Sequence, residues 1–310
     1  MQETKERILE MLSEGSVTGP DLADALDVSR AAVWKQVESL RESGFDVDGT
    51  PSGYVLESVP EYGGDAVEWG LDAPFELEYH ERIESTNGRA RELAGDGHEN
   101  MVVLADAQTG GRGRLDREWA SPSGGIWLSV LIRPTVPATH APLFTLAGAV
   151  ATARAIRELG VDARIKWPND VLVDGKKVAG ILTEMEGEAD RISWLVVGIG
   201  LNANVDVDAL PDDRNVTSLA AEIGPVERRD ATQRLLSEFY ELQTNTDAIL
   251  PAWRDLAATL GNEVRIATPS GDVVGEAVDI EFPGALVVET TAGRKTVTVG
   301  DCEHLRPGTR

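Results

Sequence analysis

The sequence is short of cysteine, of lysine and of long hydrophobic runs. One cysteine among 310 residues, Cys302, excludes an internal disulfide, and we interpret it as a packing residue rather than a reactive thiol. The longest apolar run, residues 141–153, is too short and too interrupted by threonine to span a bilayer. No secretory signal pattern follows Met1, so we expect a cytoplasmic protein with no membrane contact.

Basic residues are also scarce. The chain has 29 Lys and Arg against 53 Asp and Glu, which gives a formal net charge of −24. Such a charge opposes binding to nucleic acids and other polyanions. Because the acids are spread along the whole chain, we favour adaptation to a high-salt cytosol, where screening shortens the repulsion, over an acidic binding surface.

Length and composition indicate several folded domains. With 42% hydrophobic and 26% charged residues, the chain has the composition of a globular protein, and its length suffices for two or three cores. Residues 59–73 carry proline, glycine and acids, and the pattern changes again after residue 261. We predict an α+β protein with domains at 1–60, 74–261 and 262–310 and a linker at 61–73.

The first 60 residues have the order of a winged helix-turn-helix. Apolar periodicity predicts a helix at Thr4–Ser13 that Gly19-Pro20 breaks, and a short second helix at Asp21–Leu26. Ser29 is a suitable N-cap for a third helix, and residues 45–56 resemble a hairpin wing.

The third helix supplies the candidate DNA-facing residues. These are Ser29, Arg30, Trp34, Lys35 and Arg41. The module holds 5 basic and 12 acidic residues, however, so a module for protein contacts or dimerisation stays open as the alternative.

After Phe75, strands alternate with helices, and short strands fill the C-terminal part. The expected strands are 77–79, 101–105, 126–132, 164–168 and 194–199, with a hairpin at 171–182, and the expected helices are 89–94, 141–159, 218–222, 229–245 and 251–260. Runs at 264–266, 273–280, 285–290 and 294–299, separated by glycines, predict a small β-barrel.

Residues 106–119 are the strongest candidate for a ligand loop. Three glycines and three arginines lie within residues 110–117, and Trp119 could stack on a purine. Glycine lets backbone amides approach a ligand, and arginine suits phosphate and carboxylate. The stretch is neither a Walker A loop nor a dinucleotide fingerprint. It indicates an anion site, with a solvated turn as the alternative.

Four further segments combine backbone ends with polar side chains. Residues 85–87 (Ser-Thr-Asn) precede a helix, where they serve as caps or present donors to a ligand. Asn169 and Asp170 follow the end of a strand, where they form a turn or a site for a metal ion or ribose. Lys177 stands at the start of a strand, and a surface lysine is the default interpretation there. Residues 198–202 form a glycine-flanked tip that ends in Asn202.

Taken in order, these five segments resemble biotin protein ligases, and with the leading winged helix the chain is similar to the bifunctional class that also represses the biotin operon. The resemblance covers essentially the whole chain. It implies a central mixed α/β catalytic domain similar to class II aminoacyl-tRNA synthetases and a C-terminal SH3-like β-barrel.

The resemblance also implies chemistry and partners. Biotin and ATP, with Mg²⁺, would form biotinyl-5′-AMP and pyrophosphate, and a lysine of a biotin carboxyl carrier domain of an acyl-CoA carboxylase would accept the biotin. Operator DNA and a second copy of the chain would be the partners in repression.

Family roles carry over by position. The matching biotin-binding positions are Ser85, Thr86, Asn87, Gln108, Arg112, Gly113, Arg114 and Lys177. The matching nucleotide-side positions are Trp119, Asn169, Asp170 and Asn202. Lys177, Arg112 and Arg114 would be the catalytic residues, and Asp170 would contact the metal ion.

The sequence departs from the family at one loop position, where Asp116 stands in place of a third glycine. A carboxylate there would slow loop closure, loosen the adenylate or pair with Arg114 or Arg117. Two other functions stay open: a biotin-sensing transcription factor without ligase activity, and a lipoate or octanoyl transferase.

Overall fold

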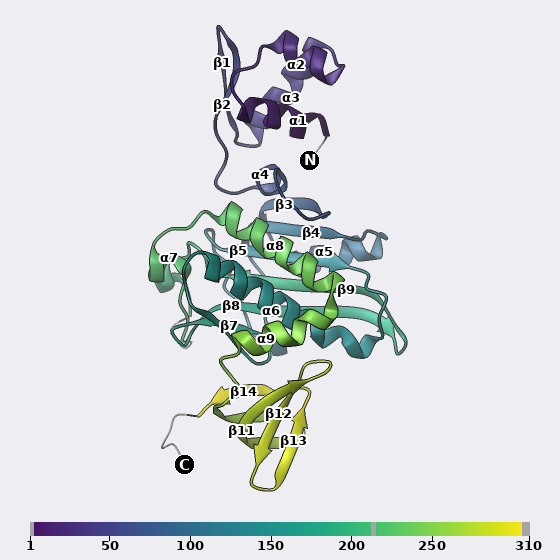
Figure 1. The fold of residues 1–310 in the computed structure, drawn as a ribbon, viewed down its shortest axis with the longest axis vertical. Coiled ribbons are helices and arrows are strands. Elements are labelled where there is room, and N and C mark those ends of the chain that lie inside the picture. The colour runs from purple at the N-terminus through teal and green to yellow at the C-terminus, as the bar shows by residue number, and fades with distance from the viewer. Residues whose placement is uncertain (1–2, 212–214, 306–310) are drawn as a thin grey trace.

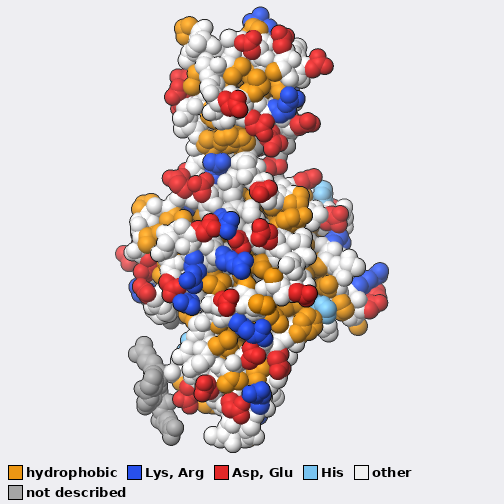
Figure 2. Space-filling model, in the orientation of Figure 1, with side chains coloured by type: hydrophobic (Ala, Val, Ile, Leu, Met, Phe, Trp, Pro, Cys, Tyr) orange, Lys and Arg blue, Asp and Glu red, His pale blue; other side chains and the backbone are white. Residues whose placement is uncertain are grey.

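The computed structural model describes residues 3–211 and 215–305 and consists of three parts stacked along its long axis (Figure 1). A winged helix lies at one end, a mixed α/β domain in the middle and a small antiparallel sheet at the other end. On the face drawn in Figure 2, acidic side chains are spread over all three parts. On this face the acidic side chains are therefore not gathered at one site.

The winged helix follows the expected order. Its elements are α1 (Glu3–Ser13), α2 (Gly19–Leu26), α3 (Arg30–Glu42), β1 (Asp46–Thr50) and β2 (Gly53–Ser58). The Ser29 cap is confirmed, because its side chain accepts a hydrogen bond from the Ala32 amide. The expected start of the second helix was wrong: Thr18 caps α2, so Gly19 and Pro20 begin the helix, where proline is tolerated.

The segment expected as a linker contains a short helix, α4 (Gly64–Glu68), that belongs to both neighbouring cores. Ala66 packs in the winged-helix core, and Val67 packs in the central core. Asp65 accepts from Lys5 Nζ at 2.9 Å and from Ser43 Oγ at 2.7 Å. The segment is therefore a packed bridge rather than a loose tether.

A seven-stranded sheet of order β3-β4-β5-β9-β8-β7-β6 forms the middle part. Its strands are β3 (Glu76–Ile83), β4 (Met101–Gln108), β5 (Ile126–Ile132), β6 (Ala163–Lys166), β7 (Asp170–Val173), β8 (Lys176–Glu188) and β9 (Arg191–Leu201). Only the β3–β4 pair is parallel among the ladders of this sheet.

Helices cover both faces of this sheet (Figure 1). They are α5 (Thr86–Gly95), α6 (Ala141–Glu158), α7 (Leu219–Ile223), α8 (Arg228–Thr244) and α9 (Ile249–Leu256). The mostly buried α6 packs with α8 and α9 in the main core, whereas α5 packs in a separate cluster on the other face. Because β3 and β4 are parallel, the start of α5, which follows β3, lies at the same edge of the sheet as the end of β4.

The expected end of the last helix at residue 260 was wrong. The helix stops at Leu256 because Ala257 is extended and forms a bridge with Ile165, and the Ala258 amide donates to the Ile165 carbonyl at 2.7 Å. Pairing with β6, a long-range contact, overrides the local helical pattern.

The C-terminal part is a five-stranded antiparallel sheet of order β13-β12-β11-β10-β14. Its strands are β10 (Glu263–Thr268), β11 (Gly271–Glu281), β12 (Ala285–Thr290), β13 (Gly293–Val297) and β14 (Asp301–His304). Within the described residues no ladder joins β13 to β14, so the sheet is not closed into a barrel by backbone pairing. The sequence pattern did not predict β14.

Cys302 lies on β14 opposite Ile266 and is buried. Burial raises the pKa of its thiol to about 11, which keeps it protonated at neutral pH. The interpretation as a packing residue agrees with this environment. In the part of the chain that the structure covers, the helices are too short or too polar to traverse a lipid bilayer.

Candidate active site

A cleft of about 1120 Å³ lies where the central sheet meets the C-terminal sheet. Its walls come from the start of α5, the loop between β4 and β5, strands β7 and β8, and strand β14. The volume is slightly above the range typical of small-molecule sites, which leaves room for two substrates side by side.

The start of α5 forms the first wall. Ser85 caps the helix by accepting from the Gly88 amide at 3.2 Å. Gln108, at the end of β4, accepts from the Thr86 amide at 2.8 Å and from the Thr86 hydroxyl at 3.1 Å, and donates to Ser121 at 3.0 Å. These bonds hold the predicted biotin-binding residues in one orientation.

Asn87 is fixed from two sides by residues that the sequence analysis missed. Ser129 Oγ donates to Asn87 Oδ1 at 2.6 Å, and Asn87 Nδ2 donates to Glu184 at 2.7 Å. Ser129 pairs across the sheet with Gly198, where a Cβ would collide with Asn87. Ser129 is a lone polar residue in the apolar run 126–132, and this signal was available in the sequence.

The glycine- and arginine-rich loop folds back on itself. The Gly113 amide donates to the Arg117 carbonyl at 2.8 Å, and the Trp119 amide donates to the Gly111 carbonyl at 3.0 Å. Leu115 and Asp116 at its tip have φ angles of 56° and 59°. Asp116 thus adopts the left-handed conformation that glycine takes freely and aspartate tolerates better than most residues. Its carboxylate lies 3.6 Å from Arg112, so it pairs with neither Arg114 nor Arg117.

Arginines of this loop reach the C-terminal sheet. Arg114 Nη2 donates to the Gly300 carbonyl at 2.9 Å, and its Nη1 lies 3.6 Å from Asp301 Oδ1. Arg117 forms an ion pair with the same carboxylate. Arg114 also donates to Asn169 Oδ1 at 3.2 Å. Asp301, which the sequence analysis missed, therefore links the loop to a strand that lies more than 180 residues later in the sequence.

Lys177 and Asp170 face each other at the centre of the cleft. Lys177 Nζ lies 2.5 Å from Asp170 Oδ1 and 4.9 Å from the centroid of the Trp119 ring. The Trp119 ring rests on Gly180 and Gly200, and a Cβ at Gly200 would collide with the indole nitrogen. The two glycines thus make a flat floor for an aromatic ring.

Every charged side chain expected to meet a phosphate already has an acidic partner. Arg112 is paired with Asp116, and Lys177 is paired with Asp170. Arg114 lies beside the carboxylate of Asp301. An anionic substrate that meets these cations therefore competes with carboxylates that already lie beside them.

The two predicted asparagines differ in place. Asn169 lines the cleft and donates to the Ile181 carbonyl at 2.9 Å. Asn202 is not a lining residue: it is buried and donates to the Thr217 carbonyl at 3.0 Å. Its Oδ1 has no hydrogen-bond partner within the described residues. The expected contact of Asn202 with the nucleotide stays a prediction. The unpartnered Oδ1 is a buried acceptor that no residue of the described structure satisfies.

No group of three or more His, Cys, Asp or Glu residues that could hold a metal ion occurs in residues 3–211 and 215–305. Asp170 lines the cleft and is paired with Lys177. These donors do not fit a resident metal centre. They fit Mg²⁺ that arrives on substrate phosphates, because such an ion needs only one or two protein carboxylates.

Comparison with known proteins agrees with this arrangement. The Biotin/lipoate A/B protein ligase family matches residues 79–202, the Biotin protein ligase C terminal domain matches 259–305, and an HTH domain matches 4–55. The bifunctional ligase/repressor BirA of Bacillus subtilis is 36% identical over 315 residues, which cover 96% of this chain and 97% of that protein. The chain belongs to the biotin protein ligase family.

Other relatives extend the similarity. The bifunctional ligase/repressor BirA of Escherichia coli is 28% identical and covers 91% of each chain. The structure of the biotin protein ligase from Aquifex aeolicus in complex with biotin and ATP is 25% identical with a TM-score of 0.63, and covers 74% of this chain and 98% of that one. Within the ligase family, this chain thus matches both full-length repressors and a shorter ligase.

In this family member, four of the five predicted DNA-facing residues are exposed at the N-cap and in the first half of α3. Ser29, Arg30 and Lys35 are exposed, and Trp34 is 58% exposed. Arg41, the fifth, is half-buried, and its Nε donates to the Val47 carbonyl at 2.7 Å. That side chain ties α3 to the wing.

Proposed function

We propose that the protein is an ATP-dependent biotin ligase that forms biotinyl-5′-AMP and transfers biotin to a lysine of a biotin carboxyl carrier domain. The supporting observation is the convergence in one cleft of three cations, Lys177, Arg112 and Arg114, with the fixed amides of Asn87 and Gln108. Fixed amides suit a neutral ureido group, whereas the cations suit a carboxylate and phosphates.

In the first step, a carboxylate oxygen of biotin forms a bond to the α-phosphorus of ATP, and the bond from that phosphorus to the bridging oxygen of pyrophosphate breaks. Two anions must meet, so their repulsion has to be offset. Lys177 exchanges Asp170 for the substrate carboxylate, and Arg112 and Arg114 exchange their acidic neighbours for phosphate oxygens. Positioning and charge neutralisation carry most of the catalysis in such reactions.

In the second step, the lysine amine of the acceptor attacks the acyl carbon and AMP leaves. The mixed anhydride is hydrolysable, so the loop at 110–119 has to exclude water until the acceptor arrives. Trp119, on its glycine floor, is placed to stack on the adenine, and Asn169 and Asp170 lie on the nucleotide side. When bound with ATP, Mg²⁺ would be held through Asp170 and phosphate oxygens and would offset phosphate charge.

The winged helix supports a second role as a biotin-responsive repressor that acts on operator DNA as a dimer in the cytoplasm. Arg30 and Lys35 are both exposed in the first half of α3, and no acidic residue lies between them in the sequence. The module as a whole is acidic, so phosphate contacts must come from these few side chains. Arg30→Gln and Lys35→Gln should each weaken binding to duplexes from upstream of biotin synthesis or transport genes in a gel-shift assay.

The ligase proposal is tested by acceptor labelling in high-potassium buffer with ATP and Mg²⁺. The acceptor is a purified biotin carboxyl carrier domain, and mass spectrometry locates the modified lysine. We expect biotin to be attached and lipoate and octanoate to be refused. Attachment of lipoate or octanoate in preference to biotin would instead identify a transferase of the related type. No attachment of any acid would favour a sensor without ligase activity.

A further inference from the structure

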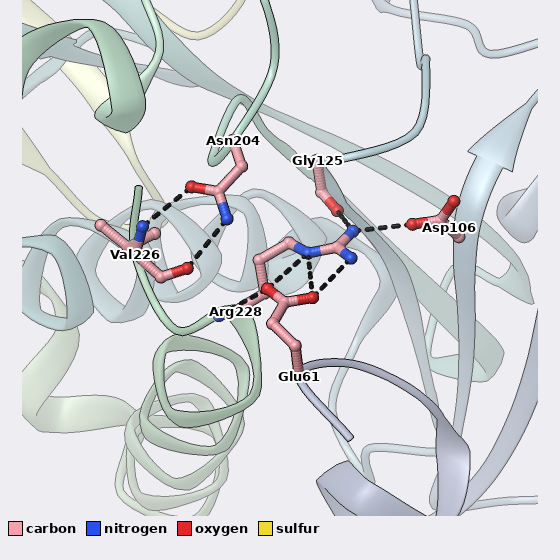
Figure 3. A network of polar contacts seen from close by, with 6 residues as sticks. All are labelled: Glu61, Asp106, Gly125, Asn204, Val226 and Arg228. Carbon is pink, nitrogen blue, oxygen red and sulfur yellow. Dashed lines mark hydrogen bonds and ion pairs between the residues drawn. The ribbon is translucent and has the colours of Figure 1, made fainter. Parts of the chain in front are cut away.

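Arg228 is a buried charged residue that the ligase chemistry does not use. It is the first residue of α8 and only 8% exposed, and its guanidinium contacts four residues, of which Figure 3 shows Glu61, Asp106 and Gly125. Nη1 donates to Asp106 Oδ1 at 2.7 Å and to the Gly125 carbonyl at 3.2 Å. Nε and Nη2 donate to Glu61 at 2.9 and 2.7 Å, and the guanidinium lies 4.2 Å from the centroid of the Tyr62 ring.

Two of these partners, Asp106 and Gly125, bound the segment between β4 and β5 that contains the ligand loop. Asp106 lies on β4 just before Gln108, and Gly125 immediately precedes β5. The residues between them include all of the glycine- and arginine-rich stretch. One nitrogen of Arg228 therefore bridges the two points where this segment leaves the sheet and returns to it.

The other partners belong to the bridge to the winged helix. Glu61 and Tyr62 precede α4, and the neighbouring Arg229 donates to the Ala66 carbonyl at 2.8 Å and to the Trp69 carbonyl at 3.1 Å. Trp69 in turn packs edge-on against Phe45 of the winged helix, with ring centroids 6.3 Å apart. The start of α8 thus holds the bridge and the ends of the loop together.

The charges in this cluster depend on one another. Burial by itself raises the pKa of the Asp106 carboxyl, but hydrogen bonds from Ser123 and Arg228 outweigh it and keep the pKa below its usual value. A buried guanidinium is tolerated only while its carboxylates and carbonyls are in place. A shift of the bridge that removes Glu61 therefore weakens the hold of Arg228 on both ends of the loop.

We propose that Arg228 is a positioning residue that couples the ordering of the ligand loop to the position of the bridge that carries the winged helix. Closure of the loop over ligand and placement of the bridge then favour each other, because both need the same arrangement of one guanidinium. Coupling of this kind is reciprocal, so a change at Glu61, which lies outside the cleft, alters ligand binding inside it. The inference rests on the proposed function only in the choice of biotin as probe.

The test uses the full-length protein with Glu61→Gln, and Asp279→Asn as the matched control. Both changes remove one carboxylate from an arginine that joins two parts of the molecule. Their side chains are similarly exposed, 41% for Glu61 and 49% for Asp279. The control pair, Arg254 with Asp279, links α9 to β11 and touches neither end of the loop.

The first readout is cleavage by trypsin without ligand, since Arg112, Arg114 and Arg117 are cleavage sites inside the loop. We expect Glu61→Gln to speed cleavage in the loop by about fivefold or more, the lower end of ordinary coupling effects, and Asp279→Asn to leave it within about twofold. Arg228→Lys, which keeps the charge but loses the planar fork, should act like Glu61→Gln.

The second readout is biotin affinity by isothermal titration calorimetry in high-potassium buffer. Glu61→Gln should weaken biotin binding by about fivefold or more, whereas Asp279→Asn should not. Equal cleavage rates and equal biotin affinities for the two variants would overturn the coupling. If the wild-type protein binds no biotin, the proposed function fails, and the cleavage rates alone still decide whether Arg228 orders the loop.

Discussion

The substitution Ser129→Ala tests whether the hydrogen bond between Ser129 and Asn87 serves biotin binding as well as the stability of the core. The Ser129 side chain is fully buried, and its single proton serves Asn87 Oδ1 at 2.6 Å or Thr86 Oγ1 at 2.8 Å. Its removal leaves the Asn87 carbonyl oxygen buried without this donor, which costs about 1–3 kcal/mol. Asn87 keeps its bond to Glu184, so the amide stays in the cleft but loses one of its two side-chain anchors.

We expect this loss to appear in two measurements. The free energy of unfolding, from urea titration, should fall by about 1–3 kcal/mol. Biotin affinity should weaken by about tenfold, equivalent to about 1.4 kcal/mol, because the amide must be reordered on binding. Ser193→Ala removes a hydroxyl from an exposed position of β9 and should change neither quantity. Lower stability with unchanged biotin affinity would refute the assignment of Asn87 and Ser129 to the biotin site.

Three further outcomes follow from the loop and the charge. Asp116→Val places a β-branched residue at φ 59° and should slow pyrophosphate exchange, whereas Asp116→Gly should preserve it; equal rates would contradict this. Asp301→Asn should increase AMP release without acceptor, because the loop loses its anchor, and a double-mutant cycle with Arg117→Gln should be non-additive. With a net charge of −24, the free energy of unfolding should rise with KCl up to molar concentration, and a flat response would remove the high-salt interpretation.

Local patterns predicted much of the fold because caps and periodicity are local properties. Ser29 and Ser85 cap helices as expected, and the strand at residues 126–132 has the predicted bounds. The errors occur where a distant partner decides the outcome. The last helix ends early because residues 257–258 pair with β6, and β14 is a strand because β10 lies beside it.

The residues of the site also differ in whether local sequence or a distant contact identifies them. Residues in recognisable segments, such as Asn87, Arg114 and Lys177, line the cleft. Asp301 and Arg228 were missed because their roles depend on contacts with residues far along the chain, and a lone acid or arginine gives no local signal. The positions of these two residues in the structure, rather than their sequence context, identify them.

The most direct test of the central claim is biotin-dependent exchange between ATP and labelled pyrophosphate, in high-potassium buffer with Mg²⁺. Lys177→Ala is compared with Lys176→Ala, because the adjacent Lys176 pairs with Glu222 and does not line the cleft. We predict exchange that requires biotin, persists in Lys176→Ala and is lost in Lys177→Ala. Folded wild-type protein that shows no exchange, or a Lys177→Ala variant that exchanges as fast as wild type, would contradict the account.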